Sequence, residues 1–238
     1  LKFFDQLVYA ADPAHAEAAT AYDKVRTRRQ RLLDEGQADP AWLNALESEM
    51  AGHGVAMAAA RLDALIRLQG EIDARPEGAF PQADLALDGA VEADLADGLD
   101  AGTAEDRFAA ALRDGRRRDG AAGRTLTRGP HRTELVARHR DKDQAAGDCS
   151  TGEQKALILT LALAQARALA RQGGVAPLLL FDEACAHLDA PRREGLAREI
   201  LATGSQAWLT GVERVLFEPF AERVQYFEVD AARVERSA

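Results

Sequence analysis

Two acidic residues, Asp182 and Glu183, directly follow the short apolar run from Leu178 to Phe181. Such a run is typical of a buried strand in a parallel sheet, and ligands bind beyond the carboxyl ends of such strands. Adjacent carboxylates at this place are costly unless they face a metal ion or a nucleotide. Asp182 is therefore a candidate ligand for Mg²⁺, and Glu183 is a candidate to orient or deprotonate an attacking water.

A second candidate site begins at Ser150, at the head of a long apolar helical run. Ser150 and Glu153 have the spacing of a capping box, which predicts that a helix begins at Ser150. The unsatisfied N–H groups and partial positive charge of a helix start bind phosphate, and the Ser150 hydroxyl would add to them. Capping boxes occur throughout globular proteins, so an ordinary capped helix is the alternative interpretation.

Three motifs of the chain together resemble those of the ABC-type ATPases of the SMC, Rad50 and RecF group. They are the signature from Ser150 to Lys155, the Walker B strand from Leu178 to Glu183, and the D-loop from Ala186 to Asp189. Three further features narrow the resemblance to RecF, the bacterial DNA repair family within that group. These are Gly-Pro-His-Arg at 129–132, Trp-Leu-Thr-Gly at 208–211, and an opening like Phe3-Phe4-Asp5 and Asp12-Pro13 before a helical arm.

The resemblance implies an α/β fold, in which a helical arm is inserted into an ABC-type ATPase lobe with a P-loop NTPase-like sheet and flanking helices. It implies ATP and Mg²⁺ as cofactors, and a homodimer that forms on ATP. Asp189 would couple the two nucleotide sites of that dimer. The signature residues that would act in trans on the other protomer's ATP are Ser150, Gly152 and Lys155.

The signature departs from the Leu-Ser-Gly-Gly-Gln form of the group at three positions. Cys149, Thr151 and Glu153 stand where that form has leucine, glycine and glutamine. These changes keep the helix cap, but they leave the strength of γ-phosphate sensing open.

For function, the resemblance implies ATP-dependent binding to duplex DNA and to junctions of single and double strands. The processes implied are recombinational repair, the SOS response and replication-gap processing, with slow hydrolysis driving release. The implied protein partner is RecR, with RecO as a further candidate.

Two functions from other classes stay open. One is the nucleotide-binding subunit of an ABC transporter, and the other is a non-enzymatic scaffold that uses the arm for protein contacts. Transporter subunits place a histidine just after the strand predicted at Gln206 to Thr210, whereas this chain has Gly211 there. The helical arm also counts against a transporter subunit.

The chain lacks the Gly-x-x-x-x-Gly-Lys-Ser/Thr loop whose backbone cradles phosphates. None of its lysines follows a glycine, and these are Lys2, Lys24, Lys142 and Lys155. The first residue, Leu1, is not an initiator methionine. We therefore expect the C-terminal part of a longer and weak ATPase, incomplete at the N-terminus and inactive alone. A divergent domain that binds no nucleotide is the alternative.

Composition predicts a cytoplasmic location. Hydrophobic residues make up 47% and charged residues 29% of the 238 residues, with no run long enough to span a bilayer and no visible signal peptide. The two cysteines, Cys149 and Cys185, fit a reducing compartment and are expected to pack as small side chains rather than to form a disulfide.

Glycine, proline and helix-capping residues predict the organisation of the chain. Residues 1–11 would end an ATPase-lobe segment, and residues 12–76 would form the helical arm as two helices, broken at Gly36 and Pro40. Residues 77–122 would connect the arm to the lobe, and residues 123–238 would form the C-terminal ATPase half. In that half we expect a helix capped by Asp189 and a last strand from Arg223 to Val229, followed by a polar tail.

Basic residues gather in two stretches of a chain whose formal net charge is −9. Between residues 107 and 142 there are eleven Arg or Lys against four acids, and the first arm helix has a basic face that includes Arg26 and Arg29. A solvated surface, or ion pairs with the acidic residues 84–106, would explain these charges without a ligand. We predict instead that DNA phosphates are contacted by Lys24, Arg28, Arg31, Arg116, Arg117 and Arg118.

The Gly-Pro-His-Arg motif follows a possible strand from Thr125 to Arg128. Its His131 and Arg132 either reach a phosphate or orient a loop, and the sequence leaves both roles open. No spacing of cysteines makes His131 or His139 a zinc ligand.

Overall fold

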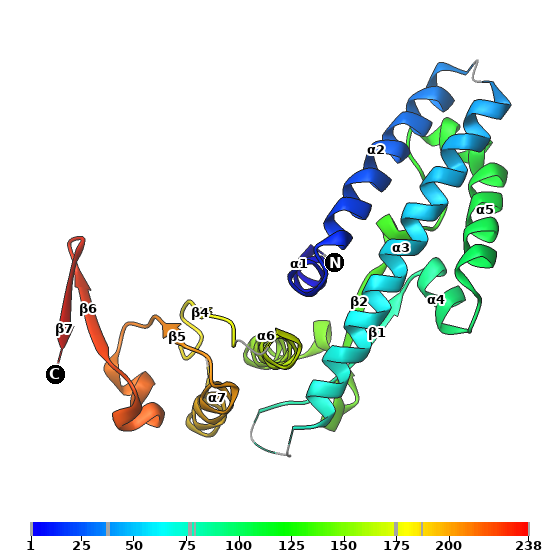
Figure 1. The fold of residues 1–238 in the computed structure, drawn as a ribbon. Helices are drawn as coiled ribbons and strands as arrows, with labels where there is room; N and C mark the ends of the chain where they lie inside the picture. The colour runs from blue at the N-terminus through cyan, green and yellow to red at the C-terminus, as the bar shows by residue number, and fades with distance from the viewer. Residues whose placement is uncertain are drawn as a thin grey trace. The chain divides into compact units, whose positions relative to one another are not determined.

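The computed structural model describes residues 2–36, 39–75, 78, 80–173, 176–186 and 188–237, without the side chains of 221 and 222. The predicted boundary at 76 and 77, and His187 of the D-loop motif, lie outside these residues. The chain forms two compact units (Figure 1). The arm unit comprises residues 1–67 and 85–137, and the motif unit comprises residues 68–84 and 138–238. These units are defined by packing, and the four predicted segments stay predictions.

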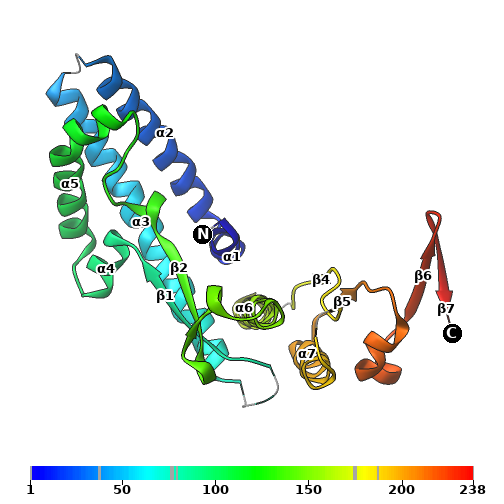
Figure 2. The same cartoon turned by 180° about the vertical axis from the view of Figure 1, so that it is seen from behind.

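The arm unit is mainly helical. It contains α1 (Lys2–Ala11), α2 (Ala14–Glu35), most of α3 (Pro40–Asp73), α4 (Ala90–Ala96), α5 (Ala101–Ala122), the 3₁₀ turn η1 (Pro130–Arg132) and part of β2 (Glu134–His139). Both ribbon views show α2, α3 and α5 running side by side (Figures 1 and 2). Their shared apolar core includes Tyr22, Val25, Met50, Phe108 and Leu112.

The predicted helical pair of the arm is confirmed. Helix α2 ends at Glu35, and Gly36 has a φ of +70°, a conformation that glycine adopts without a steric penalty, and its N–H donates to the Leu33 carbonyl. Helix α3 begins at Pro40, where a missing N–H costs nothing. Apolar side chains of α3 differ in burial, since Trp42 is 59% exposed while Met50 is fully buried.

A fully buried ion-pair network lies inside the arm unit. Arg29, predicted to lie on the basic face of α2, is instead 0% exposed. Its guanidinium donates to Glu47 on α3 at 2.9 Å, to Asp119 on α5 at 2.9 Å and to the Leu112 carbonyl at 2.6 Å. Asp119 also accepts from the N–H groups of Leu126 and Thr127. Because every charge has partners, the network fixes how α2, α3 and α5 pack.

A second buried arginine connects several elements of the arm unit. Arg61 on α3 is 2% exposed and donates to Asp5 on α1 at 2.8 Å, to Glu92 on α4 at 3.2 Å and to the Pro130 carbonyl at 2.7 Å. Residues 1–11, predicted to end an ATPase-lobe segment, therefore form a helix whose Asp5 is paired within the arm unit.

The motif unit packs two long helices against two short parallel strands. Its elements after β2 are η2 (Arg140–Lys142), β3 (Gln144–Ala145), η3 (Ala146–Asp148), α6 (Thr151–Gly173), β4 (Leu179–Phe181), α7 (Ala190–Thr203), β5 (Ala207–Leu209), η4 (Arg214–Arg223), β6 (Tyr226–Asp230) and β7 (Arg233–Ser237). Strands β4 and β5 are parallel, with Leu180 opposite Trp208, and α7 is the crossover between them. The core of this unit includes Phe80, Leu163, Phe181, Leu188 and Leu196.

Several predicted strands differ from the structure. Strand β1 (Ala83–Asp88) joins a sheet of order β1-β2-β3. Residues 125–128 form no strand, because Asp119 takes the N–H groups of Leu126 and Thr127 that a sheet would need. The predicted polar tail contains β7, which pairs antiparallel with β6. The run predicted as a fully buried strand is shorter than expected, and its Leu180 is 72% exposed.

Among the described residues, no helix combines the length and the apolar character that a membrane span requires.

Candidate nucleotide site

The Walker B acids stand where the sequence placed them, at the carboxyl end of β4. Phe181 closes the strand and is buried, and the chain then leaves the sheet, so that Asp182 and Glu183 are both exposed. Glu183 has a φ of +50°, in the left-handed region that residues with a side chain adopt rarely. A turn follows, in which the N–H of Ala186 donates to the Glu183 carbonyl at 3.2 Å.

Thr210 connects the two acids, and the sequence interpretation missed it. Its hydroxyl lies 2.5 Å from Oδ1 of Asp182 and accepts from the N–H of Glu183 at 2.9 Å. A carboxylate only accepts, so the hydroxyl proton points to Asp182. The Thr210 N–H donates to the Phe181 carbonyl at 3.0 Å, directly beyond the paired strands. The available signal was its position at the end of a strand predicted beside the Walker B strand.

The acids fit a Mg²⁺ ion that is held mainly by water and phosphate. Among the described residues, no group of three or more His, Cys, Asp or Glu could hold a metal ion by itself. Magnesium sites at phosphates commonly use one or two carboxylates and keep several waters. Asp182, oriented through Oδ1 by Thr210, meets that requirement.

The signature helix begins as predicted, although its capping differs in detail. Helix α6 starts at Thr151, and the N–H of Gln154 donates to the Ser150 carbonyl at 2.9 Å. Glu153 accepts from the Ser150 N–H at 3.0 Å, as in a capping box. The Ser150 hydroxyl donates to the same carboxylate at 2.9 Å. A phosphate at this helix start would therefore compete with Glu153 for that hydroxyl.

Glu153 is the electrostatic centre of the helix start. The hydrogen bond from Lys142, at 2.5 Å, together with those from Ser150, lowers the pKa of Glu153 to about 2. Arg192 on α7 approaches the same carboxylate at 3.7 Å and the Asp189 carboxylate at 3.8 Å. The signature and the start of α7 are thus joined through one arginine.

The D-loop residue Asp189 is the N-cap of α7, as predicted. Its carboxylate accepts from the N–H of Arg192 at 2.9 Å, and Pro191 occupies the first turn. The other signature residues, Gly152 and Lys155, lie half-buried at the head of α6. The structure therefore gathers the predicted nucleotide residues into two groups, one at the start of α6 and α7 and one at the end of β4.

The residues predicted to contact DNA lie in different environments. Lys24, Arg28 and Arg117 are exposed, and Arg31 is exposed but paired with Glu35 at 2.9 Å. Arg118 donates to the Thr127 hydroxyl at 3.1 Å. Arg116 faces inward and pairs with Glu47, which is 0% exposed. The predicted phosphate contact of Arg116 is therefore replaced by an internal one.

Internal ion pairs with the acidic stretch, the alternative left open by the sequence, are present. Arg107 pairs with Asp94 at 2.8 Å, and Arg128 pairs with Asp88 at 2.7 Å. In the motif unit, Arg140 pairs with Asp84 at 2.7 Å.

The Gly-Pro-His-Arg motif fixes a loop to the helices of the arm unit. The Nε2–H of His131 faces the Thr125 carbonyl at 3.3 Å, so its Nδ1 accepts from the Tyr22 hydroxyl at 2.7 Å. Burial lowers the pKa of His131 to about 4, which keeps the ring neutral. A side chain at Gly129 would collide with the ring of Phe108. These contacts favour the loop-orienting role for His131.

Comparison with known proteins identifies similar proteins for this chain. No family model matches the chain. The protein named DNA replication and repair protein RecF from Caulobacter sp. (strain K31) is 52% identical over 223 residues, covering 91% of this chain and 57% of the relative. The RecF of Rhizobium meliloti (strain 1021) is 47% identical, covering 98% of this chain and 62% of the relative. Over these matched residues the chain is similar to proteins named RecF. It spans about three fifths of the length of these RecF relatives.

The RecF fold is also the fold of this chain. A solved structure described as the recombination mediator protein RecF with ATPrS has a TM-score of 0.78 and is 18% identical. It covers 100% of this chain, and the match takes in 62% of the solved chain. A second structure, of RecF with ATP, has a TM-score of 0.76. The α/β fold expected for an ABC-type ATPase lobe with a helical arm is therefore confirmed.

Proposed function

We propose that the complete protein is an ATP-dependent DNA-binding protein of recombinational repair and replication-gap processing. The observation that carries this proposal is the Walker B end of β4, where Thr210 orients Asp182 and holds Glu183 by its backbone. Similarity to RecF proteins over the matched residues supports it, because these relatives are named DNA replication and repair proteins.

Each predicted site residue has a separate proposed role at the nucleotide. Ser150, Gly152 and Lys155 lie at the start of α6, and with the free N–H groups of that helix they would bind the γ-phosphate of the other protomer's ATP. Mg²⁺, when bound, neutralises charge on the transferred phosphate. Asp182 would hold the ion and Glu183 would orient the attacking water. Asp189 would couple the two nucleotide sites, with Arg192 linking its carboxylate to Glu153 of the signature.

The arm supplies the contact with duplex DNA and with junctions of single and double strands. Its phosphate contacts are proposed to come from Lys24, Arg28, Arg31, Arg117 and Arg118. The protein acts in the cytoplasm as a homodimer formed on ATP, with RecR as partner and RecO as a further candidate. Slow hydrolysis releases the DNA.

DNA binding by the full-length gene product, with and without ATP and over a series of salt concentrations, tests the function. We expect binding that requires ATP and weakens steeply with salt. Equal binding with and without nucleotide would contradict the proposal and favour a scaffold.

The catalytic role of Glu183 has a separate test. Glu183→Gln should trap an ATP-bound dimer, measured by light scattering. Glu194→Gln, which removes an equal charge from the exposed face of α7, is the matched control and should leave the dimer transient. A dimer population that ignores Glu183→Gln would rule out hydrolysis at this site.

A further inference from the structure

Two exposed arginines of the loop after α5, Arg124 and Arg132, differ from several paired arginines of the arm unit. Arg107, Arg116 and Arg128 each pair with a carboxylate from another element. Arg124 is exposed, and no ion pair involves it among the described residues. Arg132 donates only to a backbone carbonyl, that of Leu126 at 3.4 Å. Positive charge is therefore uncompensated at this loop.

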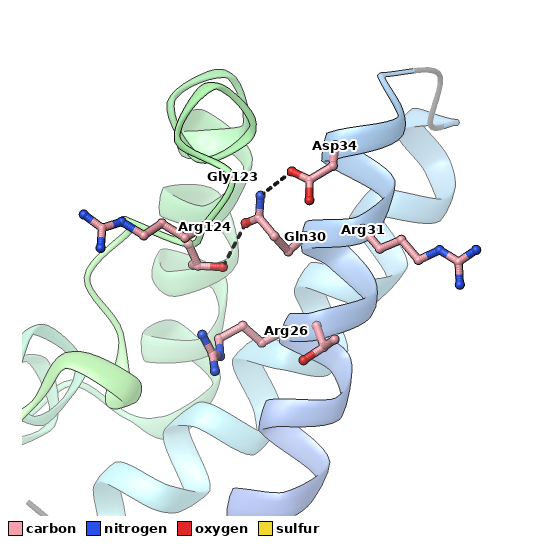
Figure 3. A pocket seen from close by; sticks show the side chains of 8 residues that line it. Arg26, Gln30, Arg31, Asp34, Gly123 and Arg124 are labelled. Atoms are coloured by element: carbon pink, nitrogen blue, oxygen red, sulfur yellow. Dashed lines mark hydrogen bonds between the residues drawn. The ribbon is translucent and has the colours of Figure 1, made fainter.

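Arg124 shares a pocket with residues of α2. The depression has a volume of about 340 Å³, and its lining includes Arg26, Gln30 and Thr125. Figure 3 shows Arg26 and Arg124 directed to the same side of Gln30, whereas Arg31 points to the opposite side of α2. Arg26 pairs with Asp23 at 3.0 Å, but Asp23 is exposed, so water screens this pair and an incoming anion can compete for Arg26.

The loop that carries Arg124 is held rigidly. The carboxylate of Asp119 binds the N–H groups of Leu126 and Thr127, and the Thr125 hydroxyl faces Gln30 at 3.4 Å. His131 is bonded to Tyr22 further along the loop. A loop anchored by buried groups on both sides presents Arg124 with little freedom, which reduces the entropy lost on binding.

The lining chemistry selects the kind of anion. It consists of arginine, threonine, glutamine, aspartate and glycine, with no aromatic or apolar side chain. Among the described residues, the lining therefore offers a nucleobase no aromatic ring, whereas arginine, threonine and glutamine are the donors that contact phosphate oxygens. Asp34, whose carboxylate accepts from Gln30 at 2.8 Å, is the one acidic residue of the lining.

We propose that Arg26 and Arg124 form a pocket for a phosphodiester of a nucleic-acid backbone, bound without regard to base sequence. The inference rests on the proposed function and adds a specific anchor to it, at two residues outside the set predicted from the sequence to contact DNA. The Gly-Pro-His-Arg motif then contributes to phosphate binding indirectly, because its contacts hold the loop of Arg124 in place.

Arg124→Ala and the double change Arg26→Ala/Arg124→Ala test the pocket in the full-length protein with ATP. Duplexes of two unrelated sequences are titrated at several salt concentrations. Each lost phosphate contact should weaken binding to both duplexes equally and reduce the salt slope of the affinity by about 1. The matched control is Arg107→Ala, which removes the same charge from a side chain already paired with Asp94. Arg124→Lys should restore part of the affinity.

The outcomes separate this inference from the proposed function. If the unaltered protein binds no DNA, the proposed function fails and the pocket inference with it. If it binds, but Arg124→Ala matches Arg107→Ala in affinity and slope, only the pocket inference is overturned. A third outcome would also overturn the pocket inference. If inorganic phosphate binds the unaltered protein but not the double variant, while both bind DNA equally, the pocket is a site for a free anion.

Discussion

The arm unit and the motif unit use charge in opposite ways. In the arm unit, Arg29 and Arg61 are almost completely buried and bond to carboxylates from several helices. In the motif unit, Asp182, Glu183 and Asp189 stand exposed beyond a strand or at a helix cap, whereas Glu153 of the signature is buried. Buried charges determine packing, because each is costly without its partners, whereas charges at element ends remain available to a ligand. The same residue types are structural in one unit and available for chemistry in the other.

The largest effect should come from removing a buried charge. Arg29→Met leaves Glu47 and Asp119 buried without their shared partner. We expect a loss of roughly 3–5 kcal/mol in unfolding free energy, measured by urea denaturation of the full-length protein. Arg28→Met, one residue away and exposed, should change it by less than about 0.5 kcal/mol. Similar losses for the two variants would contradict the assignment of Arg29 to the interior.

A smaller loss is expected from Gly129→Ala. The added methyl group would meet the Phe108 ring in the core of the arm unit, and overpacking of this kind costs about 1–3 kcal/mol. Gly52→Ala is the control, since nothing lies near the added carbon and alanine favours a helix interior. Thermal unfolding should therefore shift down for the first variant and slightly up for the second.

As the pH falls, the two units should lose stability in different pH ranges. The pKa of His131 is lowered to about 4, so the stability it contributes is complete above pH 6.5 and is lost as the pH falls toward 4. The pKa of Glu153 is lowered to about 2, so its contribution is lost only between about pH 4.5 and 2. Hydrogen exchange should show that the loop around His131 opens more easily first, with its free energy of local opening lowered by about 1–2 kcal/mol. Simultaneous loosening of both regions would contradict this order.

The smallest stability effect belongs to Thr210→Val, which keeps the shape of the side chain. It removes the donor to Asp182 and the acceptor of the Glu183 N–H. We expect a loss of about 1 kcal/mol in stability and a roughly tenfold weaker Mg²⁺ affinity in the presence of nucleotide. Thr210→Ser should restore the affinity. Unchanged Mg²⁺ affinity in Thr210→Val would show that Thr210 does not orient Asp182.

The two units also differed in how well the sequence predicted them. The starts of α6 and α7 depend on residues within a few positions of one another, and their spacing predicted them. The inward turn of Arg29 depends on Asp119, which lies 90 positions along the chain, and no local pattern indicates it. Thr210 was missed for a related reason, because its hydrogen bonds cross to a strand 28 positions earlier.

Helix α2 carries three buried polar side chains at intervals of seven residues. These are His15, bonded to Asp5 on α1, Tyr22, bonded to His131, and Arg29, bonded to α3 and α5. Residues seven apart lie on one face of a helix, so the three bonds share one stripe. A slide of α2 by one turn would break all of them together, at about 1–3 kcal/mol for each group left unpaired. The three bonds therefore fix the position of α2 along its own axis relative to the elements that they contact.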